Sequence, residues 1–577
     1  MMIKALITVF NTLFLLTITT ILVSNNIKTF AADKFSLEHN VIYDIQPTGS
    51  TLVNQNITIT NQENDVIATN YTLTTKYTDI TEEKGIEDDN KMGVKKEVTD
   101  NNTRLTAIFN NVSIGKGNTK SFTISYKTSS ILSKIGSVWY LNIPKSEITN
   151  ATTLYNVQLV VPKEFGNQLF ISPSPELIKD TSDTQTTFYF TKEALSTRGI
   201  TAAFGNYQTL NFKLDYQLKN DKFLNAIYEI ALPSDIEGYQ QVSYKELSPK
   251  PIKTYLDKDN NVIAQYWVKG KSNLDIEAKG SVKLITKQIK LNEGGSFKSI
   301  SKDLISKYTK EDTYWEKSSK IVDSIKDKIY NKDQNVSQNA FNIYEYVINN
   351  FEYNTDVVNK SYIDRKGALN ALTLKEPIAC MEFTDVFVAI ARNMGIPARE
   401  INGYAITNDT KSNTPASINI KGGDLLHSWA EFYDPNFGWV QIDPTWGNTS
   451  KIDYFTKLDT NHFAFVTRGI DSEYPLPAGM YRYENNTKLI NIDFSNSINT
   501  DFEPKLEVKK IFNFSPIHAL LGYSRYEIKN IGTIYVNGIN KTNLAPDQST
   551  TMFIQKDTRG ISYKDFKGNI QVLKIGN

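Results

Sequence analysis

The sequence predicts a multidomain protein in which an α+β core is flanked by all-β domains of the sandwich and immunoglobulin-like kinds. The first observation is the length of 577 residues, enough for about three or four domains. The second is the alternation of apolar and polar residues, typical of strands, across residues 33–290 and again across 476–577. The third is a helical spacing of apolar residues between these two blocks.

The composition is that of an ordinary globular protein, with 40% hydrophobic and 22% charged residues. The formal net charge of +1 gives no indication of a nucleic-acid partner or of binding to an anionic membrane surface. The chain has a single cysteine, Cys380, so it forms no internal disulfide. Such a thiol is either buried as a small apolar residue or kept for its chemistry.

Residues 1–32 are typical of a secretory signal peptide. Lys4 precedes an apolar run over residues 5–23, and the small residues Ala31 and Ala32 follow a short polar stretch. Because about 20 apolar residues also span a bilayer, a retained N-terminal anchor is the alternative. In both cases we expect residues 33 onward at the cell surface or outside the cell, with membrane contact only through such an anchor.

The two β-rich blocks before the core are predicted as separate domains. Residues 33–210 alternate clearly at 52–60 and 121–126, which favours a β-sandwich. The polar stretch at 88–96 is predicted to be a loop. Residues 211–290 form a second β-rich domain with a tight hairpin at 256–262, where Asp and Asn tolerate turn conformations. Neither block contains a cluster of ligand or acid residues, so we expect them to act as scaffold or recognition domains.

Residues 291–475 are predicted to form the core, and residues 476–577 a C-terminal immunoglobulin-like β domain. Within the core, apolar residues recur at helical spacing over 315–330 and again over about 338–349. The C-terminal block returns to strands, and the segments 526–532 and 544–549 are typical of a small immunoglobulin-like sandwich.

Cys380 stands at the start of a predicted helix. Apolar residues share one face of that helix, at Phe383, Val386, Phe387, Ile390 and Met394. Gly395 ends it, and Pro397 prevents its continuation. The free N–H groups and the dipole of a helix N-terminus stabilise a thiolate, which is the nucleophilic form of cysteine. The same N–H groups are placed to hold the oxyanion of a tetrahedral intermediate.

A hairpin further along the chain supplies a base and an acid. His427 lies on one predicted strand, residues 434–438 make a turn, and Asp443 ends the return strand. Strands paired symmetrically about Pro435 would place His427 directly opposite Asp443, and a shift of two residues would make them diagonal neighbours about 7–8 Å apart. Asp443 then orients one imidazole nitrogen, and the other takes the proton of Cys380. We therefore predict a triad of Cys380, His427 and Asp443.

Three segments around these residues resemble the transglutaminase-like core. They are residues 395–404 (GIPAREINGY), 427–431 (HSWAE) and 438–446 (GWVQIDPTW), which follow the Cys380 helix in the family's order. The resemblance covers roughly residues 300–470. It implies a papain-like α+β fold with Cys380 as nucleophile, His427 as base and Asp443 as orienting acid. The family often has Gly two residues before the cysteine, where this chain has Ile378, which bears on the approach of substrate.

Other residues near the motifs are assigned supporting roles. Tyr353 is a candidate for substrate binding at the oxyanion, with a core aromatic as the alternative, and Trp429 is predicted to pack beside the site and bind substrate. Arg399 is expected in a buried ion pair with Glu382 or Glu431. His462 is a candidate for the rim of the site. The polar stretch 407–424 is interpreted as either a lid or a surface excursion.

The sequence predicts no metal site and no cofactor, because it lacks HExxH, paired cysteines and phosphate-binding glycine loops. The predicted function is acyl transfer on peptide or protein amides through a Cys380 thioester, with cell-wall or surface proteins as candidate substrates. Water as acceptor makes the enzyme a protease or amidase, and an amine makes it a cross-linking transglutaminase. The alternative is a catalytically silent surface protein with a binding or structural role. The sequence does not predict an oligomeric state.

Overall fold

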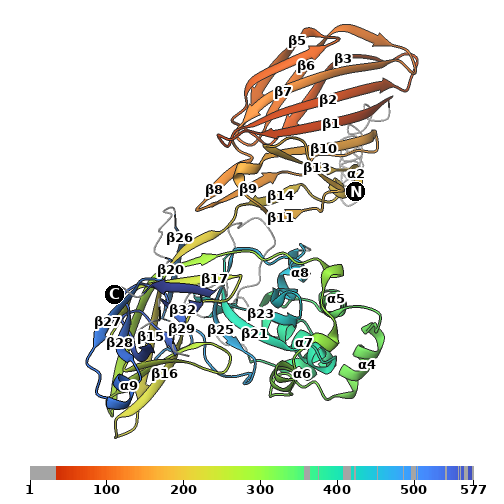
Figure 1. The fold of residues 1–577 in the computed structure, drawn as a ribbon. Helices are drawn as coiled ribbons and strands as arrows, with labels where there is room; N and C mark the ends of the chain where they lie inside the picture. The colour runs from red at the N-terminus through yellow and green to blue at the C-terminus, as the bar shows by residue number, and fades with distance from the viewer. Residues whose placement is uncertain are drawn as a thin grey trace, which may run out of the picture. The chain divides into compact units, whose positions relative to one another are not determined.

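The protein is described here by a computed structural model covering residues 34–574 except 357–363, 375, 407–417, 421–423, 451, 485–486, 496–501, 503, 540–541, 556–557, 559 and 565–569. It is a multidomain, mostly β structure with several antiparallel sheets and one helical region (Figure 1). The chain divides into two compact units: one runs to Lys134 and includes Trp139–Phe204, and the other contains Ile135–Val138 and Gly205–Asn577. The finer boundaries at 210, 290 and 475 stay predictions.

The predicted signal peptide or anchor, residues 1–32, lies outside the described residues, and so does most of the predicted lid at 407–424. Among the helices of the described chain, none is long and apolar enough to cross a membrane.

The first unit is built from two sheets around one apolar core. In the larger sheet β1 pairs parallel with β10 and antiparallel with β2, and the order is β12-β13-β10-β1-β2-β7-β4-β5-β6-β3. Its strands are β1 (Phe35–Ile45), β2 (Thr51–Asn61), β3 (Ile67–Thr75), β4 (Thr81–Glu87), β5 (Asn90–Val98), β6 (Thr103–Ile114), β7 (Thr119–Thr128), β10 (Thr152–Pro162), β12 (Leu177–Asp180) and β13 (Gln185–Phe190). The smaller sheet has the order β11-β14-β9-β8, and its strands are β8 (Leu132–Ile135), β9 (Val138–Ile143), β11 (Gln168–Ser172) and β14 (Ile200–Phe204); a short helix, α2 (Lys192–Leu195), precedes β14.

The prediction of a loop at 88–96 is wrong. These residues form the turn and second strand of the β4–β5 hairpin, in which Glu87 pairs with Asn90. Asp88 and Asp89 make the turn with φ of 47° and 62°, a conformation that aspartate tolerates better than most residues. The strand was missed because most of its residues are polar and exposed, while Met92 and Val94 alone face the core.

The second unit begins with two sheets that share an apolar core. Their orders are β17-β20-β15-β26 and β16-β19-β18. The strands are β15 (Gln208–Asn220), β16 (Ala226–Leu232), β17 (Gln240–Ser248), β18 (Lys253–Leu256), β19 (Val262–Val268), β20 (Ser272–Leu284) and β26 (Ile490–Phe494). The predicted hairpin at 256–262 is confirmed, because Leu256 pairs with Val262 and Asn260 adopts a φ of 70° in the turn.

The helical region follows, and it packs around α7. Its helices are α3 (Lys302–Tyr308), α4 (Lys320–Ile329), α5 (Val336–Asn350), α6 (Gly367–Leu374), α7 (Cys380–Asn393) and α8 (Pro444–Ser450). Ser319 caps α4 and Asn335 caps α5 by accepting backbone N–H groups, so both helices begin at these polar residues. The helix predicted over 315–330 therefore starts at Lys320, after a turn that contains Trp315.

An antiparallel sheet lies against α7 and carries the segments that contain Gly403, His427 and His462. Its order is β22-β23-β21-β25, with β24 paired to β23. The strands are β21 (Ala398–Ala405), β22 (Ile418–Ile420), β23 (Asp424–Asp434), β24 (Gly438–Ile442) and β25 (His462–Arg468). Apolar residues of α7, β23 and β24 share one core with those of α4 and α5, which fixes the start of α7 relative to the sheet.

The C-terminal strands form two small antiparallel sheets of order β27-β28-β31 and β30-β29-β32-β33. The elements are β27 (Leu506–Ile511), α9 (Pro516–Leu520), β28 (Tyr523–Asn530), β29 (Val536–Ile539), β30 (Thr542–Leu544), β31 (Ser549–Gln555), β32 (Gly560–Lys564) and β33 (Ile570–Lys574). Ile528, Val536 and Ile554 contribute to their common core.

Candidate active site

Cys380 is the first residue of α7, as the sequence predicts. The Glu382 side chain accepts the backbone N–H of Ala379 at 3.0 Å, which fixes the start of the helix. The N–H of Cys380 belongs to the first turn of the helix, where backbone donors have no partner within the helix. The side chain is fully buried.

His427 and Asp443 come from neighbouring strands, but not in the symmetric register. Ala430 pairs with Ile442, so the pairing is shifted by two residues and β24 ends before Asp443. Of the two registers predicted, the directly opposed one is wrong, and the shift of two residues that makes His427 and Asp443 diagonal neighbours is confirmed. The hairpin turns about Asn436 rather than Pro435, because the Asp434 carboxylate accepts the N–H groups of Asn436 and Phe437.

The diagonal placement still brings the side chains of His427 and Asp443 into contact. Nε2 of His427 lies 2.9 Å from Oδ2 of Asp443, and both side chains are fully buried. The other oxygen, Oδ1, accepts the backbone N–H groups of Thr445 and Trp446 and so caps α8. Burial raises the pKa of Asp443, but His427 and the hydrogen bonds outweigh it and hold the pKa well below its usual range. Asp443 is thus a carboxylate locked in one orientation.

The other nitrogen of His427, Nδ1, makes no regular hydrogen bond. The Cys380 sulfur is close enough to interact with the ring. Burial lowers the pKa of His427, while Asp443 and then Cys380 raise it, and the outcome is a pKa of about 9. The ring therefore lies between the Asp443 carboxylate and Cys380, and both neighbours favour its protonated form.

A second imidazole belongs to the site, and the sequence predicted it only as a residue of the rim. His462, at the start of β25, directs Nε2 to the same Oδ2 of Asp443 at 3.0 Å. Its Nδ1 lies 2.7 Å from Oδ1 of Asp459. Burial lowers its pKa, but Asp459 and Asp443 raise it to about 9. One feature of the sequence could have indicated this arrangement. Asp459 lies three residues before His462, and a carboxylate at that spacing can accept a hydrogen bond from the imidazole.

Gly403 makes room for the backbone of β25 and for the Trp429 ring. It pairs with His427 on one side and with Ala464 on the other, so it lies between the strands that carry the two histidines. A Cβ at this position would lie 2.1 Å from the carbonyl oxygen of Phe463 and 2.8 Å from the Trp429 ring. Gly403, the second glycine of the GIPAREINGY segment, is therefore required for the close approach of β21 and β25.

Tyr353 lies beside Cys380. A short parallel bridge joins it to Ile378, with the Ile378 N–H donating to Glu352 and the Asn354 N–H donating to Ile378. Its side chain packs on Cys380. Burial, Cys380 and Asp443 raise its pKa, so the phenol keeps its proton. Its hydroxyl is buried and lacks a hydrogen-bond partner within the described structure, so one donor beside the sulfur is unused.

Trp429 is fully buried and packs along the imidazole. Its ring lies 5.9 Å from that of His427 at an interplanar angle of 23°. The indole N–H donates to Gln441 at 3.1 Å. The predicted packing beside the site is confirmed, whereas its contact with substrate stays a prediction.

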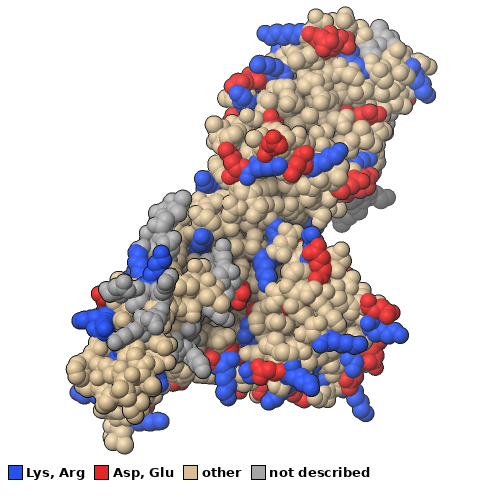
Figure 2. All heavy atoms as spheres, viewed as in Figure 1, with Lys and Arg blue, Asp and Glu red and all other residues tan. Residues whose placement is uncertain are grey.

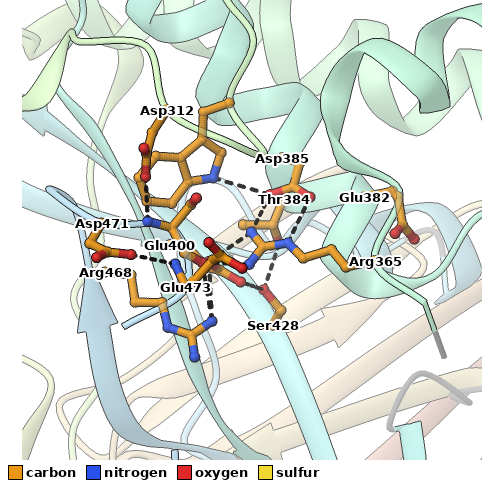
Figure 3. Close-up of polar contacts among 12 residues, drawn as sticks. Asp312, Arg365, Glu382, Thr384, Asp385, Glu400, Ser428, Arg468, Asp471 and Glu473 are labelled. Carbon is orange, nitrogen blue, oxygen red and sulfur yellow. Dashed lines mark hydrogen bonds and ion pairs between the residues drawn. The ribbon is translucent and has the colours of Figure 1, made fainter. Parts of the chain in front are cut away.

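A buried polar network ties α7 to the sheet behind the site (Figure 3). Thr384 donates to the carbonyl of Cys380 at 3.0 Å, and the Ser428 hydroxyl lies 3.3 Å from Thr384 and 3.0 Å from Glu400. Arg365 donates to Asp385 on α7 and, at 2.8 Å, to Glu400 on β21. The network holds Cys380 and the strand of His427 in fixed relative positions.

Arg399 forms the predicted buried ion pair with Glu431, its Nε donating at 2.6 Å. Its guanidinium also lies over the Trp439 ring, 3.7 Å from the centroid. Glu382, the other partner considered, caps α7 and accepts the N–H of Lys366.

The described residues bring three potential metal ligands together, His427, Asp443 and His462, with ligand atoms within 4.8 Å of one another. Both Nε2 atoms already lie at hydrogen-bond distance from one carboxylate oxygen, 2.9 and 3.0 Å away. Protons therefore account for these contacts, and we interpret the cluster as a hydrogen-bonded one.

The fold and site define a class: an α+β core with a helix-borne cysteine, a strand-borne histidine and an acid that orients it. Residues 323–444 match the model of the transglutaminase-like superfamily, so the chain contains a core of that superfamily. This confirms the resemblance carried by the three sequence motifs.

Two curated relatives match part of the chain. An uncharacterized protein of Haemophilus influenzae is 34% identical over 134 residues, which are 21% of this chain and 35% of that protein. The uncharacterized protein YebA of Bacillus subtilis is 28% identical over 170 residues, 28% of this chain and 23% of that protein. The chain thus spans about a third and a quarter of their lengths.

Among solved structures, the chain is similar to a proposed cysteine protease from Cytophaga hutchinsonii. The match has a TM-score of 0.32 and 17% sequence identity, and it covers 50% of this chain and 99% of that one.

Proposed function

We propose that the protein is an exported thiol acyl-transfer enzyme that acts on peptide or protein amides through a thioester at Cys380. The observation that carries the proposal is the environment of His427, with Nε2 on Asp443 and Nδ1 free beside Cys380. One imidazole between a fixed carboxylate and a thiol is the arrangement that activates a cysteine nucleophile.

In the proposed reaction the Cys380 thiolate attacks the amide carbonyl, and a C–S bond forms. The oxyanion is held by N–H groups at the start of α7 and by the Tyr353 hydroxyl. The C–N bond breaks as His427 gives its proton to the leaving amine. Water or a second amine then attacks the thioester and yields its proton to His427 as the thiolate leaves. The site returns to its starting protonation state.

His462 is proposed as a positioning residue that does not touch the substrate. It donates to Asp443 and is itself held by Asp459, so the acid cannot rotate away from His427. The negative charge of Asp443 therefore faces the imidazole rings of both His427 and His462.

A silent surface protein is the second candidate, and the complete burial of Cys380 favours it. The β-rich regions, predicted as sandwich and immunoglobulin-like domains, would then carry the function. The two candidates differ in whether the thiol becomes accessible in the folded protein.

The test is incubation of the full chain with peptide and amine libraries, followed by mass spectrometry. Cleaved peptides identify water as acceptor, and a mass gain on glutamine with loss of ammonia identifies an amine. Cys380→Ala is the matched control. The proposal fails if wild type and Cys380→Ala give the same products while iodoacetamide labels Cys380 in the folded wild type.

A further inference from the structure

The antiparallel strand pairs β15–β20 and β16–β19 end side by side, and the loops that connect β15 to β16 and β19 to β20 form an apolar projection that the candidate active site does not use. Phe223 is 88% exposed and Leu224 80%, and the cross-strand pair Ile227 and Trp267 is 50% and 57% exposed. We call residues 219–227 and 267–272, which make up these two loops and the strand ends beside them, the tip. Large apolar side chains exposed together mark a surface that contacts something else.

The tip is a built structure. The buried Asn220 side chain donates to the carbonyls of Leu224 and Val268 at 3.0 Å each and accepts the N–H of Lys222 at 3.0 Å. Gly270 lets the two loops approach, because a Cβ there would lie 2.0 Å from the carbonyl oxygen of Phe223. The outward placement of Phe223 and Leu224 is therefore held by buried hydrogen bonds.

Cations surround these apolar residues. The tip contains four lysines, at 219, 222, 269 and 271, and one acid, Asp221. Asp221 is paired with Lys219 at 3.1 Å. The Lys271 ammonium lies 4.6 Å from the centre of the Phe223 ring. At lower left in Figure 2, in the region where β16 lies in Figure 1, the surface is a projection with few charged atoms, and Lys or Arg atoms lie beside it. The overall charge of +1 conceals this local excess.

We propose that the tip, residues 219–227 and 267–272, docks on an anionic lipid bilayer. Phe223 and Leu224 enter the acyl region, Trp267 lies at the interface, and Lys222, Lys269 and Lys271 meet lipid phosphates. Apolar residues flanked by lysines bind membranes by apolar burial together with attraction to anionic headgroups. A protein partner with an apolar pocket would not require this surrounding of lysines.

The test uses the full chain and a readout confined to the tip, because the N-terminal apolar run of residues 5–23 can itself bind lipid. Hydrogen–deuterium exchange is measured with vesicles of phosphatidylglycerol and phosphatidylcholine, and with phosphatidylcholine alone. We expect slower exchange over 219–227 and 267–272 with the anionic vesicles only, weakening as salt screens the lysines.

Phe223→Ser combined with Leu224→Ser should abolish the protection. Each of Lys222→Gln, Lys269→Gln and Lys271→Gln should weaken binding through the tip about fivefold. The matched control is Leu177→Ser with Ile178→Ser, an exposed apolar pair on β12, which should leave the protection unchanged. Unchanged melting temperatures of the variants show that they fold.

The proposal is overturned if anionic vesicles leave exchange at the tip unaltered, even where the chain binds them elsewhere. It is equally overturned if loss of Phe512 and Phe514, two exposed aromatic residues before α9, removes the protection while the Phe223 and Leu224 variant retains it.

Discussion

Asp443 and His462 are joined by a hydrogen bond of 3.0 Å that ends on the same carboxylate oxygen as the bond from His427. Asp443 therefore serves two rings from one oxygen while its other oxygen caps α8. The carboxylate that contacts His427 on β23 is thus also held by a residue of β25, and β21 lies between these two strands.

His462→Phe keeps an aromatic ring in the site but removes the donor to Asp443. A hydrogen bond to a charged group contributes about 1.5–3 kcal/mol, so we expect kcat to fall at least about tenfold with KM within roughly twofold. His462→Gln retains a donor and should recover part of the rate. Steady-state kinetics on the amide substrate check this, with His518→Phe in α9 as control. Equal kcat in His462→Phe and wild type would contradict the positioning role.

Activity should decline above about pH 9, where His427 loses the proton that it gives to the leaving amine. The rate of amide cleavage measured from pH 6 to pH 10.5 tests this, with circular dichroism at each pH to establish that the fold persists. A rate that is flat through pH 10 would contradict the assignment of His427 as the acid.

Stability should depend on pH in a direction set by the same groups. The pKa values of His427 and His462 are raised to about 9 from 6.5, so their contribution is complete below about pH 6.5 and is lost as pH rises through 9. The pKa of Asp443 is lowered, so its contribution is complete above about pH 4 and is lost as pH falls further. We expect the melting temperature to fall from pH 6.5 to 9, and less so in His462→Phe. Scanning calorimetry measures how the melting temperature changes with pH in the wild type and in His462→Phe.

Tyr353→Phe removes the unpartnered hydroxyl beside Cys380 and little else. If this hydroxyl holds the oxyanion, kcat should fall by about 10²–10³. The rate of Cys380 alkylation by iodoacetamide should change little, since that reaction forms no oxyanion. An unaltered kcat would assign Tyr353 to packing alone.

Arg365→Met should destabilise the second unit, because it removes the cation paired with the fully buried Asp385 and leaves the buried Glu400 with the more distant Arg468, 3.9 Å away. Breaking a buried pair by removing one partner costs about 3–5 kcal/mol. Denaturant unfolding followed by tryptophan fluorescence measures the loss. Lys307→Met, which removes an exposed pair with Asp303, is the control and should have little effect. Equal midpoints for the two variants would show that the network is not stabilising.

Prediction from the sequence worked best where a local pattern determined the structure. The apolar face of α7 placed Cys380 at its N-terminus, and the turn after Asp434 placed His427 and Asp443 on adjacent strands. It failed where the pattern was ambiguous: the polar strand β5 resembled a loop, and the hairpin register was displaced by two residues because the Asp434 side chain moved the turn.

The sequence by itself determined the chemical class of the site, since the only cysteine, a helix start and a His/Asp hairpin are all local features of the chain. Only the tertiary structure decided that Cys380 is fully buried and that His462 completes the hydrogen bonding of Asp443. His462 reaches Asp443 because β25 and β23 both pair with β21 across Gly403, and such an approach depends on packing between segments distant in the chain. Pairwise strand contacts of this kind carry no periodic signal in sequence.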